Sequence, residues 1–220
     1  MVLAGCLLAA EPPATGTISG TVRFTGKVPE PKTITTTDSA TIKHNDLIVD
    51  GKTKGLRYVF VQIEDAPPQP KIKKAKAVLI DQRDMIFMPR VVAVQHGQAV
   101  RFDNNDNCNH SVMAASAVAA NQFNRFIDAN QPFEHVFEPQ KRPVLIGCSL
   151  HGWMRAWVYV VPHLWFAISD SEGRFQIAAV PPGKHTLLLT HPDTGLQERR
   201  MVQVEAGKHI SVTVDWENAK

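Results

Sequence analysis

Residues 143–161, PVLIGCSLHGWMRAWVYVV, form two apolar segments separated by a short loop. The segments at 143–148 and 155–161 are rich in β-branched and aromatic residues, the usual composition of strands. The loop between them carries a thiol, an imidazole and a thioether at Cys148, His151 and Met154, although the chain has only three cysteines and six methionines. Two strands joined by a loop with three metal-binding side chains predict a β-protein that holds a metal at one strand end.

Similar strand-like segments recur along the whole chain. Gly, Pro, Asn and Asp separate them, and only residues 111–126 show a pattern that could hold a short helix. Strands at this spacing predict an all-β chain built as one or two β-sandwiches. The expected strands lie at 17–24, 56–63, 75–81, 90–97, 98–104, 133–139, 143–148, 155–161, 174–180, 184–190 and 209–216.

Length, charge and hydropathy narrow the classes of protein. A chain of 220 residues predicts one or two domains, and 44% apolar residues are enough for a substantial core. A net charge of +3 is too small to indicate a nucleic-acid partner. The one basic run follows a proline-rich stretch and is interpreted as a solvated linker face: Lys71, Lys73, Lys74 and Lys76. No apolar run reaches the roughly 18 residues of a membrane-spanning helix, so no span is predicted.

The first ten residues, MVLAGCLLAA, are almost purely apolar and precede the polar start EPPATGT. This pattern is typical of a secretory signal, so residues 1–13 are predicted to be a signal-like leader and the protein to be periplasmic or secreted. The segment LAGC also resembles a bacterial lipobox, which would place a lipid anchor on Cys6. The apolar LLAA that follows it favours simple export, because a lipobox cysteine usually precedes a polar tether.

The three cysteines, at positions 6, 108 and 148, are too few and too scattered for a disulfide framework. In an oxidising compartment, however, a Cys108–Cys148 disulfide is a real alternative. That bond would consume the thiol that the metal hypothesis requires.

A second loop supplies the missing metal ligand. The segment VRFDNNDNCNHS (100–111) ends a predicted strand in a turn-forming polar loop that carries His110. Together with Cys148, His151 and Met154 it completes one Cys, two His and one Met, the set that binds copper in electron-transfer sites. We therefore predict one type 1 copper on these four residues and no catalytic residue. The other histidines are interpreted as structural: His44, His96, His135, His163, His185, His191 and His209.

These motifs give residues 75–162 a resemblance to the cupredoxins. The loop C-x2-H-x2-M looks most like that of amicyanin, and the approach DQRDMIFMPRVVAVQHGQAVRFDNNDN (81–107) is similar to plastocyanin-like domains. The resemblance implies a Greek-key β-sandwich with copper on His110, Cys148, His151 and Met154. Cupredoxins usually have Asn after the first histidine, whereas this chain has Ser111, whose hydroxyl can still donate a hydrogen bond toward the ligand loop but reaches less far. Cys108 is not part of the family pattern.

A composition break near Pro162 marks a further unit. The segment AISDSEGRFQIAAVPPGKHTLLL (167–189) resembles the carboxypeptidase regulatory-like, or transthyretin-like, small β-sandwich. That family opens with a Gly-rich strand, which residues 163–220 lack and which GTISGTVRFTG (16–26) would supply. The predicted division is an N-terminal β segment and linker (14–74), a copper domain (75–162) and a C-terminal sandwich segment (163–220). Alternatively, residues 14–66 and 163–220 form one shared sandwich.

The predicted function is that of a blue-copper protein that shuttles single electrons between redox partners outside the cytoplasm. Four protein ligands leave no open position for a substrate, and the His-x-His and His-Cys-His elements of copper oxidases and nitrite reductases are absent from the sequence, so no enzyme is predicted. By resemblance, partners would dock transiently near His151, with Trp153 and Met113 in an apolar patch. Trp153 is equally interpretable as a core residue. The alternatives are a periplasmic copper chaperone, buffer or sensor, and a binding module in which the copper is vestigial.

Overall fold

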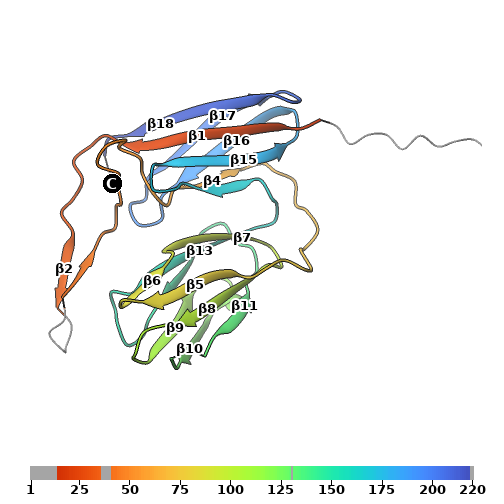
Figure 1. Ribbon diagram of the computed structural model, residues 1–220. Helices are drawn as coiled ribbons and strands as arrows, with labels where there is room; N and C mark the ends of the chain where they lie inside the picture. The colour runs from red at the N-terminus through yellow and green to blue at the C-terminus, as the bar shows by residue number, and fades with distance from the viewer. Residues whose placement is uncertain (1–13, 36–40, 130, 219–220) are drawn as a thin grey trace, which may run out of the picture.

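The computed structural model describes residues 14–35, 41–129 and 131–218 (Figure 1). The all-β prediction is confirmed, because the only helical element in these ranges is a single 3-10 turn at Ala119–Asn121. The predicted leader, with Cys6, lies outside the described residues. Within the described part of the chain, no helix is long and apolar enough to cross a membrane.

The middle of the chain forms a two-sheet sandwich, drawn in the lower half of Figure 1. The hydrophobic residues of its strands alternate inward and fill one core, which includes Phe102, Ile146 and Val158. One sheet has the order β10 (Phe123–Ile127), β9 (His110–Ala115), β12 (Val144–Gly147), β13 (Arg155–Val161) and β7 (Val91–Gln95). The other has the order β11 (Phe133–Val136), β8 (Ala99–Asn104), β5 (Val78–Arg83) and β6 (Ile86–Met88).

The two ends of the chain build a second sandwich together. β1 runs parallel to β18 and antiparallel to β15, and β4 lies between β14 and β16. The strand pairing therefore joins the segments 14–66 and 163–220, the arrangement that the sequence left open. One sheet has the order β15 (Arg174–Val180), β1 (Gly16–Phe24) and β18 (His209–Trp216); the other has β14 (Phe166–Ile168), β4 (Phe60–Ile63), β16 (Gly183–Thr190) and β17 (Gln197–Val204). The hairpin of β2 (Lys32–Thr35) and β3 (Thr41–His44) stands apart from both sheets (Figure 1).

The chain enters and leaves the middle sandwich at neighbouring points. The backbone N–H of Gln69, on the way in, donates to the carbonyl of Pro162, on the way out, at 2.7 Å. The next turn of the incoming segment is held by Ile72, whose N–H donates to His96 at 2.9 Å. Adjacent entry and exit points are what an inserted domain needs to keep its own fold.

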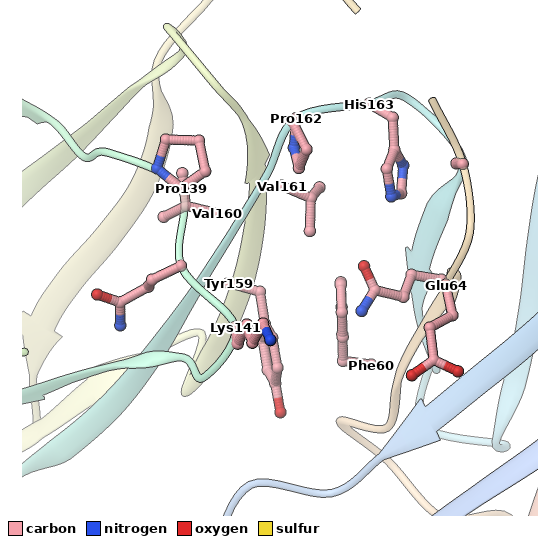
Figure 2. A pocket seen from close by; sticks show the side chains of 12 residues that line it. Phe60, Glu64, Pro139, Lys141, Tyr159, Val160, Val161, Pro162 and His163 are labelled. Atoms are coloured by element: carbon pink, nitrogen blue, oxygen red, sulfur yellow. The ribbon is translucent and has the colours of Figure 1, made fainter. Parts of the chain in front are cut away.

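The two sandwiches meet through an aromatic contact. The rings of Phe60 and Tyr159 stack with centroids 3.9 Å apart, and a pocket of about 310 Å³ opens beside them toward Lys141 and His163 (Figure 2). A charged network adds to the contact, since Arg90 on the middle sandwich lies 3.0 Å from Asp46 and 2.9 Å from Asp193. The interface combines stacking with partly buried ion pairs and fixes the middle sandwich against the outer one.

Candidate metal centre

The predicted ligands come from the start of β9 and from the loop that joins β12 to β13. His110 is the first residue of β9, and Cys148 follows the last residue of β12. Because β12 pairs with β9 on one side and with β13 on the other, the ends of these strands lie together. His151 and Met154 belong to the loop that connects β12 to β13. Strand pairing therefore brings His110 to a loop some forty residues further along the chain.

Three ligand atoms converge at this edge. The Nδ1 atoms of His110 and His151 are 3.0 Å apart, and Cys148 Sγ lies 3.9 Å and 3.6 Å from them respectively. Metal bonds of about 2.0 Å to nitrogen and about 2.3 Å to sulfur place such atoms about 3.3–3.7 Å apart in a trigonal or tetrahedral site. The observed spacings fall within a few tenths of an ångström of that range. His110 and Cys148 are buried, at 0% and 4% exposure, whereas His151 is partly exposed.

Met154 closes the ligand loop. Its N–H donates to the carbonyl of His151 at 2.9 Å, and its own carbonyl accepts a hydrogen bond from the N–H of Cys148 at 3.3 Å. Its side chain is 1% exposed and belongs to the same core cluster as Cys148. The backbone geometry thus holds the thioether-bearing residue next to the three converging atoms.

Ser111 forms hydrogen bonds to the ligand loop. The Ser111 hydroxyl accepts a hydrogen bond from the N–H of Ser149 at 2.7 Å, and the Ser111 N–H donates to Cys148 Sγ at 3.3 Å. The hydroxyl therefore reaches the ligand loop, but in its shortest bond it accepts from Ser149, whereas the sequence suggested a donor; as a donor to Cys148 Sγ it lies at 3.8 Å. These bonds fix the loop on β9 and direct donors at the sulfur, the role of partners that orient a metal ligand.

The electrostatics of the cluster favour a thiolate. Burial raises the pKa of the Cys148 thiol, but hydrogen bonds from His110 and from the N–H groups of Ser111, Leu150 and His151 outweigh it and bring the pKa down to about 6. Burial lowers the pKa of His110, yet its bonds to Cys148 and Asp106 prevail and raise it. The thiolate is the form that binds a metal.

Asp106 contacts the predicted ligand His110, and sequence reasoning did not single it out. Its Oδ2 lies 2.8 Å from Nε2 of His110. When Nδ1 gives its lone pair to a metal, the Nε2–H donates to this carboxylate, which fixes the tautomer and the ring orientation. The available signal was an acidic residue four positions before a ligand histidine, in a loop whose polar residues were interpreted only as turn formers.

The sulfur atoms of Cys108 and Cys148 lie near different ring nitrogens of His110. Cys108 Sγ is 3.5 Å from Nε2 of His110, whereas Cys148 Sγ is 3.9 Å from Nδ1. Cys148 is a free thiol in the structure. A disulfide, with its sulfurs about 2.05 Å apart, does not join the two residues in the structure.

Of the residues predicted to form the docking patch, Trp153 lies beside His151. The rings of His151 and Trp153 have centroids 5.2 Å apart, and Trp153 packs against the core while its Nε1–H donates to the carbonyl of Met85 at 3.0 Å. Met113 is 36% exposed. Leu150, which the sequence did not single out, is 50% exposed. None of the other seven histidines belongs to a group of metal-ligating side chains in the described ranges.

Comparison with known proteins finds likenesses of structure only. No family model matches the sequence, and no curated protein matches it. A purple cupredoxin from Nitrosopumilus maritimus is 22% identical, with 38% of this chain and 98% of that chain covered and a TM-score of 0.34. A mutant of amicyanin in the Cu(I) state is 19% identical, over 46% and 97%, with a TM-score of 0.35. A copper-containing nitrite reductase from Thermus scotoductus SA-01 is 18% identical, over 45% of this chain and 25% of that chain, with a TM-score of 0.38.

Proposed function

We propose that His110, Cys148, His151 and Met154 bind one copper ion as a type 1 site, and that the protein carries single electrons between redox partners outside the cytoplasm. The observation that carries the proposal is the convergence of two imidazole nitrogens and a buried thiol at metal-ligand spacing, all within 4.8 Å of one another. Bound copper would supply a one-electron couple between Cu(I) and Cu(II). The protein contributes the ligands, their orientation and the exclusion of water.

The donor set favours copper over zinc. Structural zinc sites take four strong ligands from Cys and His, and a thioether is a poor substitute for one of them. Two imidazoles, one thiolate and one weak thioether suit both oxidation states of copper. Since His110 and Ser111 are fixed by the fold, little rearrangement would accompany the change of oxidation state.

Burial supports an electron carrier over a copper chaperone or buffer. A chaperone releases its ion to a partner and needs exposed ligands, whereas His110 and Cys148 are buried. Dialysis of the copper-loaded protein against a competing chelator separates the two functions. Retention of copper supports the carrier, and rapid loss supports the chaperone, buffer or sensor.

We place the electron exit at His151, because it is the partly exposed ligand. Leu150, its neighbour in the chain, and Met113, which pairs with Gly147 at the end of β12, present apolar surface. Apolar surface around an exposed ligand suits the small, transient interfaces of redox proteins. The assignment predicts that Leu150→Lys slows electron exchange with a partner and leaves the absorption spectrum unchanged.

Export and the character of the second sandwich are parts of the same proposal. The apolar segment before EPPATGT supports export, with a lipid anchor at Cys6 as the alternative, and intact-mass analysis of the native protein distinguishes the two. The Asp/Glu-Gly and Pro-Pro-Gly turns after Pro162 support a carboxypeptidase regulatory-like sandwich, completed by β1.

The visible spectrum of the copper-loaded protein tests the copper assignment. A thiolate bound to Cu(II) should give an intense blue or green colour through sulfur-to-metal charge transfer. Cys148→Ser should abolish the colour, and Cys108→Ser serves as the matched control that should retain it. A colourless native protein that yields a Cys108–Cys148 linked peptide would contradict the proposal.

A further inference from the structure

A second group of side chains that could bind a soft metal ion lies on the Nε2 side of His110. Cys108 Sγ is 3.7 Å from Met85 Sδ and 3.5 Å from Nε2 of His110. Asp106 joins them, and the ligand atoms of Asp106, Cys108 and His110 all lie within 4.8 Å of one another. The group therefore contains a thiol, a thioether, an imidazole nitrogen and a carboxylate, none of which except His110 belongs to the proposed type 1 site.

Hydrogen bonds hold these side chains in place. Met85 lies in the turn between β5 and β6, where Asp84 and Met85 have φ of 55° and 62°, a conformation that such residues adopt rarely. The carboxylate of Asp106 maintains the turn by accepting the N–H of Asp84 at 2.7 Å and that of Met85 at 3.1 Å. On the other side, the amide of the buried Asn104 donates to the carbonyl of Cys108 at 2.9 Å. These hydrogen bonds hold the loop against the turn, with Cys108 Sγ and Met85 Sδ 3.7 Å apart.

The distances from Cys108 Sγ to Met85 Sδ and to His110 Nε2 suit a metal bound between these atoms. Bonds of about 2.3 Å to sulfur and about 2.0 Å to nitrogen separate two sulfurs by about 3.8 Å, and sulfur from nitrogen by about 3.5 Å, at a tetrahedral angle. The observed values are 3.7 Å and 3.5 Å. Thiolate and thioether ligands select soft ions, Cu(I) first among the biological ones. Cys108 is also more exposed than Cys148, so an incoming ion reaches it more easily.

We propose that Met85, Cys108 and Nε2 of His110 form a second site, which binds Cu(I), with Asp106 as the residue that positions the turn. The site does not depend on the proposed type 1 function. A neutral imidazole has one lone pair, so His110 serves either the outer site through Nε2, where the ion replaces the hydrogen bond to Asp106, or the inner one through Nδ1. One ion would therefore occupy one position or the other, and the outer, more exposed position would receive it first.

Cu(I) binding in a Cys148→Ser background tests the outer site directly, because that variant lacks the inner thiolate. The ion is added anaerobically and its affinity is measured by competition with bicinchoninate. We expect the variant to bind one Cu(I) and to show thiolate-to-copper absorption in the ultraviolet. Adding Cys108→Ser should remove that absorption and weaken Cu(I) binding by at least about tenfold. Removing only a group that hydrogen-bonds to a metal ligand already lowers metal affinity by about that factor.

A milder variant guards against a folding artefact. Met85→Leu in the same background keeps the volume of the side chain and should weaken Cu(I) binding, whereas Met113→Leu, a partly exposed methionine of β9 with no place in the group, should leave it unchanged. Equal affinity in Cys148→Ser with and without Cys108→Ser would overturn the outer site. That result is distinct from failure of the type 1 proposal, which is judged on the colour of the protein with both cysteines intact.

Discussion

Replacing Ser111 by alanine removes one oxygen atom from the contact that holds the ligand loop on β9. The hydroxyl is fully buried, accepts the Ser149 N–H at 2.7 Å and lies 2.8 Å from the Ser149 hydroxyl. The hydrogen bond from the Ser111 N–H to Cys148 Sγ belongs to the backbone and survives the substitution. The variant therefore removes side-chain contacts alone, which also include the contact from the hydroxyl to Cys148 Sγ at 3.8 Å.

Two hydrogen bonds at about 0.5–1.5 kcal/mol each set the scale of the loss. Ser149 is exposed, so water can replace part of what its groups lose, and we expect the free energy of unfolding to fall by about 1–2 kcal/mol. At about 2–4 °C for each kcal/mol in a chain of this size, the melting temperature of the metal-free protein should drop by several degrees. Because the tether orients a metal ligand, Cu(I) affinity should fall by at least about tenfold.

Calorimetry of the metal-free protein and chelator competition with Cu(I) measure the two effects. Ser211→Ala is the matched control, since Ser211 lies exposed on β18 of the other sandwich. If Ser111→Ala and Ser211→Ala have the same melting temperature and the same Cu(I) affinity, the Ser111 tether contributes nothing and the reasoning fails.

Three further outcomes follow from the structure. Met154→Leu should keep the colour of the copper-loaded protein and raise its reduction potential, measured by voltammetry, because the lost thioether is a weak axial ligand that stabilises Cu(II); a colourless variant would contradict that role. Burial lowers the pKa of His191 from 6.5 to about 4, so the unfolded chain binds more protons, and the free energy of unfolding should fall by on the order of 3 kcal/mol as the pH drops from 6.5 to 4. Urea unfolding of His191→Gln at a series of pH values should lack that part of the slope, and an unchanged slope would contradict it. A fragment of residues 66–163 should fold and give the same visible spectrum as the whole chain, because Gln69 and Pro162 already hold its ends together; a fragment that is folded but colourless would show that the site needs the outer sandwich.

Three of the strands that the sequence missed, β9, β10 and β17, share a physical cause. Residues 111–126 are rich in alanine and suggested a helix, yet β9 and β10 form there because β9 lies in the sheet between β10 and β12. β17 carries charged residues on an exposed face and shows too little hydrophobic alternation to be recognised. In both cases pairing with a neighbouring strand decided the structure, and pairing leaves no mark in the local pattern.

The sequence by itself determined the all-β class and the candidate ligands, because both depend on local information. Alternating apolar residues predict strands wherever the partner strands lie. Cys148, His151 and Met154 stand within seven residues, so the sequence alone indicates that they could bind one metal. Only the tertiary structure decided that Thr17 pairs with His209, and that Asp106, Cys108 and Met85 meet behind His110. Those contacts exist because distant segments bury their apolar faces together, and the free energy of that shared burial belongs to the assembled core rather than to any one stretch of chain.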